Sequence, residues 1–537
     1  MAYIEPNTEI RFLVNVPLDP DYENTLYFNS INEQTNYFYN RTRRVFQKQS
    51  YQRKNRGWLR VGWEGDRYGD TAIKDLFNST YMMFRNSNFE NKWFYAFVDS
   101  VEYVNNNTVD VQYHIDVLQT WHFDYVLNQC FIERQHVSND TAGANTIPEG
   151  LEHGPYICDR PSYMPLVGDP VTGGDFKYTP GILLATSFNL SYAYQGGRII
   201  PGWGSMGHYF SGVWYTTFDT SAGDIAALNS YLETISADEA KADGVISMSM
   251  IPLSLVDPQG SDYAYNDILF TMPTSLGSYT PRNKKLLTNP YNFMYVTNNQ
   301  GQSGEFYWED SYNRGYMEFR VWANYATTPA MLCAPVEYKI SSHVGNYDEM
   351  LTVQNFPICA WTNDAFKAWF AQNAGSVVAT GLGLFTNWMN AITPNTHNVI
   401  SGGGIASVIN QTLDVAGEVF DHSRRPPQVN GNSNGNLVYQ ASLMTFSFYR
   451  KFIKPEYAAI IDKYFDMYGY AVHTVGTPNR AVRRCYTYVK TVGCSIHGNL
   501  PNDDITEIQN IFNSGIRFWR STADFGNYDP SVNDNTV

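Results

Sequence analysis

The chain has 537 residues, enough for several domains at roughly 150 residues each. Hydrophobic residues make up 43 % and charged residues only 17 %, below the roughly 25 % typical of soluble domains. The formal net charge of -15 argues against a protein that grips nucleic acid, because phosphate contacts require a surplus of Lys and Arg. It does not exclude a protein through which DNA slides, since a lumen that repels phosphate avoids adhesion.

The residue types favour a β-rich protein with long loops. Aromatic residues account for 15 % of the chain, with 40 Tyr, 31 Phe and 12 Trp. Tyr, Phe, Trp and Thr suit half-buried pleated surfaces, whereas Asn and Gly suit turns. The low charge also suits surfaces that become buried against other subunits. A large secreted β-protein has a similar composition, so composition alone leaves both classes open.

The cysteines and the first residues indicate the compartment. The six cysteines are scattered and are expected to be free core thiols, since a chain of this size needs no disulfide staples: Cys130, Cys158, Cys333, Cys359, Cys485 and Cys494. The start, MAYIEP, has neither a basic nor an apolar signal region, so we expect synthesis in a cytoplasm without a signal peptide.

The first part of the chain reads as a β-sheet. Residues 9–18 predict a first strand, and 92–104 with 108–118 predict a hairpin across Asn105, Asn106 and Asn107. A further strand is expected over 123–137. A basic stretch, Arg41 to Arg60, lies between the first strand and the hairpin.

Residues 161–360 predict a second β-domain. Short apolar runs alternate there with turns rich in Gly, Pro, Asp and Asn. The one helix expected in this part covers 221–236, where apolar residues recur at three- and four-residue spacing.

Residues 362–436 differ from the rest. From Ala368 to Leu413 there is no Lys, Arg, Asp or Glu, and the apolar run 374–392 has nearly the ~20 residues that span a bilayer. Polar and glycine residues within the run weaken it on transfer scales. A buried helical hairpin, a plug inside an assembly and a membrane-inserting loop all remain open. The candidate residues for a plug or membrane contact are Val377, Val378, Leu382, Leu384, Phe385, Trp388, Met389, Ile392, Ile400, Ile405 and Val408.

The last part regains order. Pro455 opens a helix that Gly469 is expected to end, and 484–497 predicts a strand or bent hairpin. A second helix is expected after a cap at 502–504 and ends at Gly515, and a short strand follows at 517–520. Because the helices gather at one end of a sheet-rich chain, the predicted class is α+β, predominantly β.

The sequence contains no catalytic or metal-binding signature, so we expect no enzyme, no cofactor and no metal. Ser205 resembles a nucleophile elbow, but its preceding Gly stands one position too close. His114 and His122 are expected to be ordinary strand side chains, and Asp257, Asp262 and Asp267 do not follow calcium-loop spacing. The cluster at 41–60, and that of Arg480, Arg483 and Arg484, could face DNA phosphates, but salt bridges between subunits or a solvated face are favoured in an acidic protein.

Several long segments carry a family resemblance. NKWFYAFV (91–98), IDVLQTWHFD (115–124), FIERQHV (131–137) and NTIPEGLEHG (145–154) resemble the tail-knob, or distal tail-tube, proteins of small short-tailed phages of the Bacillus-podovirus type. The stretches 467–491, 498–520 and 525–528 are similar to the same family. The resemblance covers roughly the first 160 and the last 90 residues, and 161–360 matches only by position.

This resemblance implies a structural virion protein: a homo-hexameric ring of β-barrel-like tube modules through which the genome is ejected. Residues 1–160 and 437–537 would together form one tube domain, and 161–361 a second module. The insert 362–436 would plug the lumen and then enter the host cytoplasmic membrane. The implied partners are the upper tail and collar proteins of the virion, phage genomic DNA passing without sequence-specific binding, and that membrane.

Two other functions compete with this one. A receptor-binding tail protein would use its aromatic surplus to stack on cell-wall glycans, with 161–360 as the reading domain. A wall-degrading enzyme is the second competitor, and the missing motifs argue against it.

Overall fold

The computed structural model forms two compact units. It describes residues 7–49, 52–53, 57–62, 76–87, 90–105, 108–159, 162–164, 180–188, 198–200, 213–218, 222–252, 265–324, 330–339, 349–354, 358–360, 446–529 and 534–535. Unit 1 comprises Met1–Glu152, Arg282–Lys285 and Ala459–Val537, and unit 2 comprises His153–Pro281 and Leu286–Ala458. The first and last parts of the chain thus fold together, and a short middle segment joins them.

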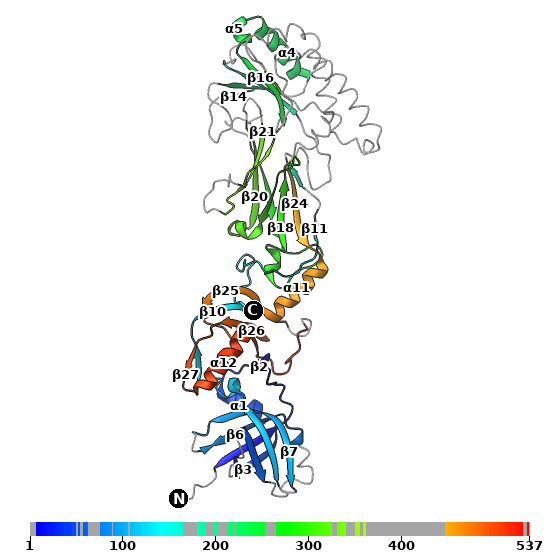
Figure 1. Ribbon diagram of the computed structural model, residues 1–537. Helices are drawn as coiled ribbons and strands as arrows, with labels where there is room; N and C mark the ends of the chain where they lie inside the picture. Colours follow the sequence, from blue (N-terminus) through cyan, green and yellow to red (C-terminus); the bar gives the residue numbers. More distant parts are fainter. Residues whose placement is uncertain are drawn as a thin grey trace. The chain divides into compact units, whose positions relative to one another are not determined.

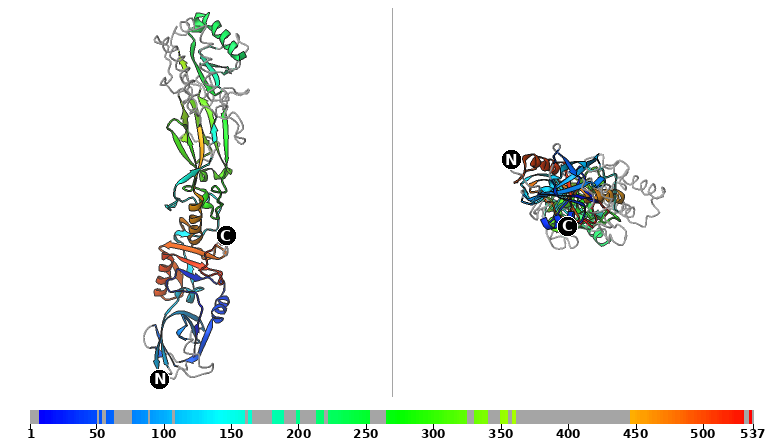
Figure 2. Two further views of the ribbon diagram at one scale, coloured as in Figure 1. Left: turned by 90° about the vertical axis from the view of Figure 1, so that its right-hand side faces the viewer. Right: turned by 90° about the horizontal axis from the view of Figure 1, so that it is seen from below.

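Unit 1 begins with a seven-stranded antiparallel sheet that curls strongly (Figures 1 and 2). Its order is β3-β1-β6-β7-β8-β5-β4. The strands are β1 (Thr8–Leu13), β3 (Thr42–Gln49), β4 (Gln52–Arg53), β5 (Trp58–Gly62), β6 (Tyr81–Asn86), β7 (Trp93–Asn105) and β8 (Thr108–Ile115). β7 and β8 pair from Ala96↔Ile115 to Asn105↔Thr108, which confirms the predicted hairpin.

The second sheet of unit 1 interleaves strands from the two ends of the chain. Its order is β2-β28-β26-β10-β25, and a two-stranded ribbon β27-β9 accompanies it. The strands are β2 (Asn24–Leu26), β9 (Tyr125–Leu127), β10 (Cys130–Gln135), β25 (Tyr470–Gly476), β26 (Tyr486–Val492), β27 (Ile496–Gly498) and β28 (Ile516–Trp519). Neither end of the chain can complete this sheet without the other.

The described part of unit 1 includes the α-helices α1 (Ile31–Tyr39), α3 (Val117–Thr120), α11 (Pro455–Tyr468), which begins in unit 2, and α12 (Asn502–Ser514). α11 has the predicted limits: it starts at Pro455, and Gly469 after it has φ +64, a left-handed conformation that favours glycine. α1 was not predicted, although Ser30 caps its start: Ser30 Oγ accepts from Glu33 N, and the Glu33 carboxylate accepts from Asn29 N, the residue before the cap.

Three expectations need correction. The cap expected at 502–504 is wrong, because Asn502 is already helical, Pro501 precedes the helix, and no side chain caps it. Of the strand or bent hairpin expected over 484–497, the strand is present as β26, but the hairpin is not, since β26 pairs with β10 whereas β27 pairs with β9. The strand expected over 123–137 is two strands, β9 and β10, that a kink separates.

Unit 2 contains three further sheets: β11-β24-β18-β19 with β12 beside β24, β14-β15-β13-β16-β23, and β17-β20-β21-β22. Its elements are β11 (Tyr156–Cys158), β12 (Ser162–Met164), β13 (Pro180–Thr186), β14 (Arg198–Ile200), β15 (Trp214–Phe218), α4 (Ala222–Ser236), α5 (Glu239–Ala242), β16 (Val245–Pro252), β17 (Tyr265–Thr271), η3 (Lys284–Leu287), β18 (Asn292–Thr297), β19 (Ser303–Tyr307), η4 (Trp308–Arg314), β20 (Tyr316–Asn324), β21 (Ala330–Val336), β22 (Leu351–Val353), β23 (Ile358–Ala360) and β24 (Phe446–Ile453), of which η3 starts in unit 1. α4 confirms the helix predicted over 221–236. The fold is therefore predominantly β with helices added, as expected.

Aromatic side chains dominate both cores. In unit 1, Phe38 of α1 is fully buried, with ring centroids 4.5 Å from Tyr95 and 5.4 Å from Tyr81. In unit 2, Phe319 of β20 lies 4.9 Å from Phe306 and 5.1 Å from Phe448, so the strands of two sheets share one core. Much of the aromatic surplus is therefore core material.

Replacement of Phe38 by Ala should destabilise unit 1 by about 3–5 kcal/mol, because it removes a ring from a packed aromatic core and leaves a cavity. Phe77→Ala is the matched control, since Phe77 is 48 % exposed and its loss should cost less than about 1 kcal/mol. Urea unfolding of the two variants measures both values, and equal losses would contradict this description of the core.

Candidate functional site

The eleven candidate residues of the plug or membrane loop, from Val377 to Val408, lie outside the described residues. The same holds for Ser205, Asp257 and Asp262. Among the helices of the described part, none is both long and apolar enough to cross a membrane. The membrane role of the loop therefore stays a prediction.

The histidines singled out in the sequence have structural roles. His114 Nδ1 lies 2.8 Å from the Asp99 carboxylate rather than beside Asp116, which caps α3 by accepting from Gln119 N. His122 is buried after α3, not on a strand, and its Nε2 lies 3.0 Å from Phe28 O. Within the described ranges no group of three or more His, Cys, Asp or Glu side chains could hold a metal ion.

The basic clusters make contacts within the chain. Arg60 forms a bidentate pair with Asp110 at 2.7 and 2.8 Å. Arg480 donates to the Tyr125 hydroxyl at 3.1 Å, and Arg483 is buried and donates to Asn535 O at 3.4 Å. The salt bridge of Arg60 therefore joins two neighbouring strands of the same chain, β5 and β8.

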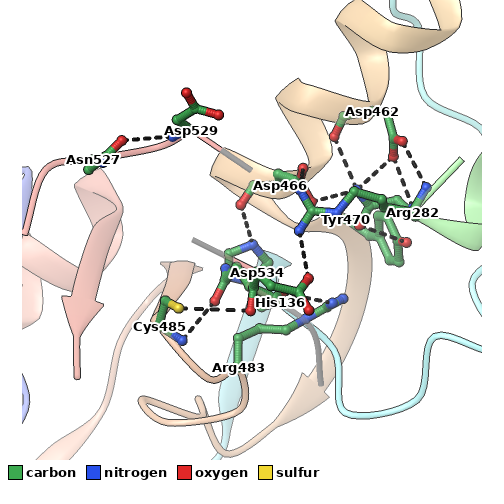
Figure 3. Close-up of polar contacts among 12 residues, drawn as sticks. His136, Arg282, Asp462, Asp466, Tyr470, Arg483, Cys485, Asn527, Asp529 and Asp534 are labelled. Atoms are coloured by element: carbon green, nitrogen blue, oxygen red, sulfur yellow. Dashed lines mark hydrogen bonds and ion pairs between the residues drawn. The ribbon is translucent and has the colours of Figure 1, made fainter. Parts of the chain in front are cut away.

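A buried polar network in unit 1 joins distant parts of the chain, and its centre is Asp462 on α11 (Figure 3). The Asp462 carboxylate accepts hydrogen bonds from Arg282 N at 2.8 Å and Asn283 N at 2.9 Å. The side-chain amide of Asn283 donates a third bond to it at 2.8 Å. One carboxylate therefore fixes the backbone of the 282–285 segment against α11.

One helical turn later, Asp466 extends the network. Its carboxylate accepts from Asn283 Nδ2 at 2.9 Å and pairs with Arg282 Nη1 at 3.0 Å. The Asp466 backbone carbonyl accepts from His136 Nε2 at 3.0 Å, while His136 Nδ1 accepts from Tyr488 N at 2.9 Å. His136 is therefore neutral with its proton on Nε2, and it links α11 to β26.

The third carboxylate of the network is Glu149. It is buried and pairs with Lys285 Nζ at 2.5 Å, with Arg134 of β10, and with the backbone N–H of Ala471 at 3.0 Å. Burial lowers the pKa of Lys285, and the adjacent Glu149 carboxylate opposes that shift. Removal of Glu149 would leave the buried Lys285 without its carboxylate partner, which costs about 3–5 kcal/mol.

The last described residues close the network from the other side. Asn535 is buried, and its side-chain oxygen accepts from Cys485 N at 3.1 Å and Tyr486 N at 3.0 Å. Asp534 lies 3.4 Å from Arg282 (Figure 3). Residues 534–535 are thus tied to Arg282 and to the start of β26.

This arrangement serves to hold the fold. Burial raises the pKa of Asp466 and of Asp140, whose carboxylate accepts from the Tyr470 hydroxyl. N–H and O–H donors of the protein bond to these carboxylates. The network joins segments around residues 134–149, 282–285, 462–471, 483–488 and 534–535 into one structural unit.

Sequence reasoning missed this network, although one signal was present. Asp462 and Asp466 stand four residues apart on a helix, where like charges repel unless they have partners. The partners Arg282 and Asn283 lie about 180 residues away in sequence. The spacing alone could indicate a need for donors but not identify them.

Two family models match the chain. Residues 6–126 match the N-terminus of caudoviral major tail proteins, and residues 257–533 match the C-terminal domain of the tail knob protein gp9 of Bacillus phage phi29. Together with the curled sheets, these matches define a structural protein of a bacteriophage tail. Because the second match covers more than half of the chain, the chain belongs to the gp9 tail knob family.

Individual relatives agree over the full length. The tail knob proteins gp9 of Bacillus phages PZA and phi29 are each 26 % identical to this chain, and the alignments cover 98 % of it and 99 % of each relative. Among solved structures, the tail knob protein gp12 of bacteriophage C1 has the same fold, with a TM-score of 0.59 at 15 % identity over 99 % of this chain and 100 % of that one. The chain is therefore a component of the virion tail.

Substitution of Asp462 by Asn should lower the free energy of unfolding by about 3 kcal/mol, because a neutral amide replaces the charge and turns a donor toward other donors. The exposed Asp503→Asn on α12 should change it by less than about 0.5 kcal/mol. Chemical unfolding measures the difference. An unchanged free energy of unfolding in Asp462→Asn would show that the network does not stabilise unit 1.

The contribution of His136 to the stability of unit 1 should fall as the pH is lowered from about 6.5 toward 3. Burial, with Arg483 and Arg517 adding to it, lowers the pKa of His136 to about 3, so the folded protein leaves the ring neutral while the unfolded chain protonates it near pH 6.5. His136→Gln offers one amide donor and one amide acceptor in place of the two ring nitrogens and does not titrate. The free energy of unfolding of the variant should therefore depend less steeply on pH. The two slopes should differ by up to about 1.4 kcal/mol per pH unit.

The exposed His497→Gln is the matched control and should keep the slope of the wild type. Unfolding curves at a series of pH values between 7 and 4 provide the slopes. Parallel curves for the wild type and His136→Gln would show that His136 does not cause the acid sensitivity.

Proposed function

We propose that this chain is the subunit of a DNA ejection conduit, a homo-hexameric ring at the distal end of a short phage tail. The observation that carries the proposal is the match to tail knob proteins over 98 % of the chain, through both units and not through one domain only. Curled sheets built from both ends of the chain suit a tube wall, because such a wall needs rigid elements whose exposed faces meet their copies.

In this proposal the ring has no catalytic task. Residues 1–160 and 437–537 form one tube domain and 161–361 a second module. The partners are the upper tail and collar proteins, the DNA that passes through the lumen, and the host cytoplasmic membrane. The net charge of -15 is consistent with a lumen that does not retain DNA.

The uncharged insert 362–436 would close the lumen before infection. Six copies of a Gly-, Ala- and Val-rich segment could bury in one channel the apolar surface that a single subunit would expose. When released, the same surface gains about 25 cal/mol per Å² on transfer into lipid. Phe385, Trp388 and Met389 are the proposed membrane anchors, since Trp favours the membrane interface.

Negative-stain electron microscopy with a parallel mass determination tests this function. We expect hollow six-fold rings or short tubes with a mass six times the 61.1 kDa of the chain. Deletion of 368–413 should clear density from the channel and leave the ring diameter unchanged, because the insert contributes to the plug and not to the wall. A uniform monomer would contradict self-assembly into a conduit and favour the glycan-binding function, and a channel that the deletion leaves filled would contradict the plug.

A further inference from the structure

Two buried thiols meet in unit 1, on a ribbon formed by the two ends of the chain. β10 pairs with β26 at Phe131↔Val492, and β9 pairs with β27 at Leu127↔Ile496. Between these points Asn128 N donates to Ser495 O at 2.8 Å, so the pairing keeps one register throughout. Continued through the gap, this register places Cys130 opposite Gly493 and next to Cys494.

Between these two pairs the buried face of the ribbon becomes its exposed face. Phe131 and Val492 form an exposed pair, 39 % and 54 % accessible, whereas Ile496, four residues beyond Val492, is buried again. The exchange needs a residue with free backbone torsion, and Gly493 supplies it at φ +67. Cys130 and Cys494 stand on either side of the exchange and are both buried, at 7 % and 6 %.

The two side chains lie close enough for each thiol to influence the pKa of the other. The surrounding backbone is fixed: Cys494 N donates to Asn513 Oδ1 of α12 at 3.0 Å. Neighbouring strands lie about 4.8 Å apart and successive residues about 3.4 Å apart, so the diagonal between the Cα atoms of Cys130 and Cys494 is about 6 Å, and disulfides join Cα atoms about 4.4–6.8 Å apart. The pair is therefore within the range that a disulfide bridges without a change of fold.

We propose that Cys130 and Cys494 form an oxidative modification site, which a small-molecule disulfide such as oxidised glutathione converts to a protein disulfide once the virion has left the reducing cytoplasm. The structure holds both residues as thiols, which is the state expected during synthesis. The proposal does not depend on the conduit function, since it needs only the fold of unit 1 and release of the virion.

The reaction proceeds by two thiol–disulfide exchanges. One cysteine thiolate attacks a sulfur of oxidised glutathione, which releases one reduced glutathione and leaves a mixed disulfide. The second cysteine then attacks the protein sulfur of that mixed disulfide and releases the second glutathione. Two S–H bonds are lost and one S–S bond forms within the protein, while two electrons and two protons leave on the two glutathione molecules.

The surroundings make this step slow. Burial raises the pKa of Cys494 to about 12 and also raises the pKa of Cys130, so few thiolates exist at neutral pH. Such a pair resists transient oxidants, and its oxidation proceeds over hours to days through local opening of the ribbon. Cys158, which is exposed, should react with glutathione much sooner.

The disulfide would connect the first and last parts of the chain covalently. The loop that it closes contains residues 131–493, which include all of unit 2. In the chain-entropy model, longer loops gain more stability from a cross-link because the unfolded chain loses more freedom. Oxidation should therefore raise the melting temperature of unit 1 and keep the two ends of the chain together.

Peptide mapping of the full-length protein tests the proposal directly. The protein is incubated for several days with oxidised glutathione, its remaining thiols are blocked, and it is digested with trypsin without reduction. Peptides 93–134 and 491–517 should appear as one cross-linked species, lighter by two hydrogen atoms than their sum. The species should disappear on reduction. Recovery of Cys130 and Cys494 as thiols, or as separate glutathione adducts, would overturn the proposal.

Two variants separate this disulfide from others. Cys158→Ser removes the exposed thiol and should leave both the linked peptides and the rise in melting temperature on oxidation unchanged. Cys494→Ser in the same background should abolish both. If Cys494→Ser retains the rise in melting temperature, the stabilisation comes from another cause and the proposed staple is wrong.

Discussion

The burial of the Asp462 carboxylate is the constraint on which unit 1 depends. A carboxylate loses its hydration when it is buried, and three donors from Arg282 and Asn283 restore its hydrogen bonds. These donors come from a segment far from α11 in sequence, so the interaction forms only when both segments are in place. The carboxylate therefore makes the folding of α11 conditional on the 282–285 segment.

The same dependence extends through the rest of the unit. Asp466, His136 and Glu149 connect α11 to β10, β25 and β26, and the interleaved sheet already requires strands from both ends of the chain. A subunit of a tail is exposed to forces from its neighbours. The contacts between the distant segments of its chain must therefore hold under those forces. Buried and paired charges at these contacts suit that requirement, because separating them would leave unpaired ions.

The local features of this fold could be predicted from sequence, and the long-range ones could not. The β7–β8 hairpin and the helices α4 and α11 were predictable, because alternation, Asn turns, Pro455 and Gly469 act over short distances. α3 has only four residues, too few for a helical period, and the pairing of β27 with β9 depends on contacts more than 360 residues apart. The network at Asp462 was hidden for the same reason. The family was recognisable because its motifs lie in continuous segments, whereas the function of 362–436 stays a prediction from composition.

Hydrogen exchange at the backbone amides of Arg282 and Asn283 tests the central claim most directly. Both amides donate to the side chain of Asp462 and not to a backbone carbonyl group, so the carboxylate protects them from exchange. If the network holds unit 1 together, the peptide that contains them exchanges as slowly as peptides from β10 and β26, and Asp462→Asn accelerates all three. Rapid exchange of 282–283 in a protein whose strands remain protected would show that unit 1 is stable without this network.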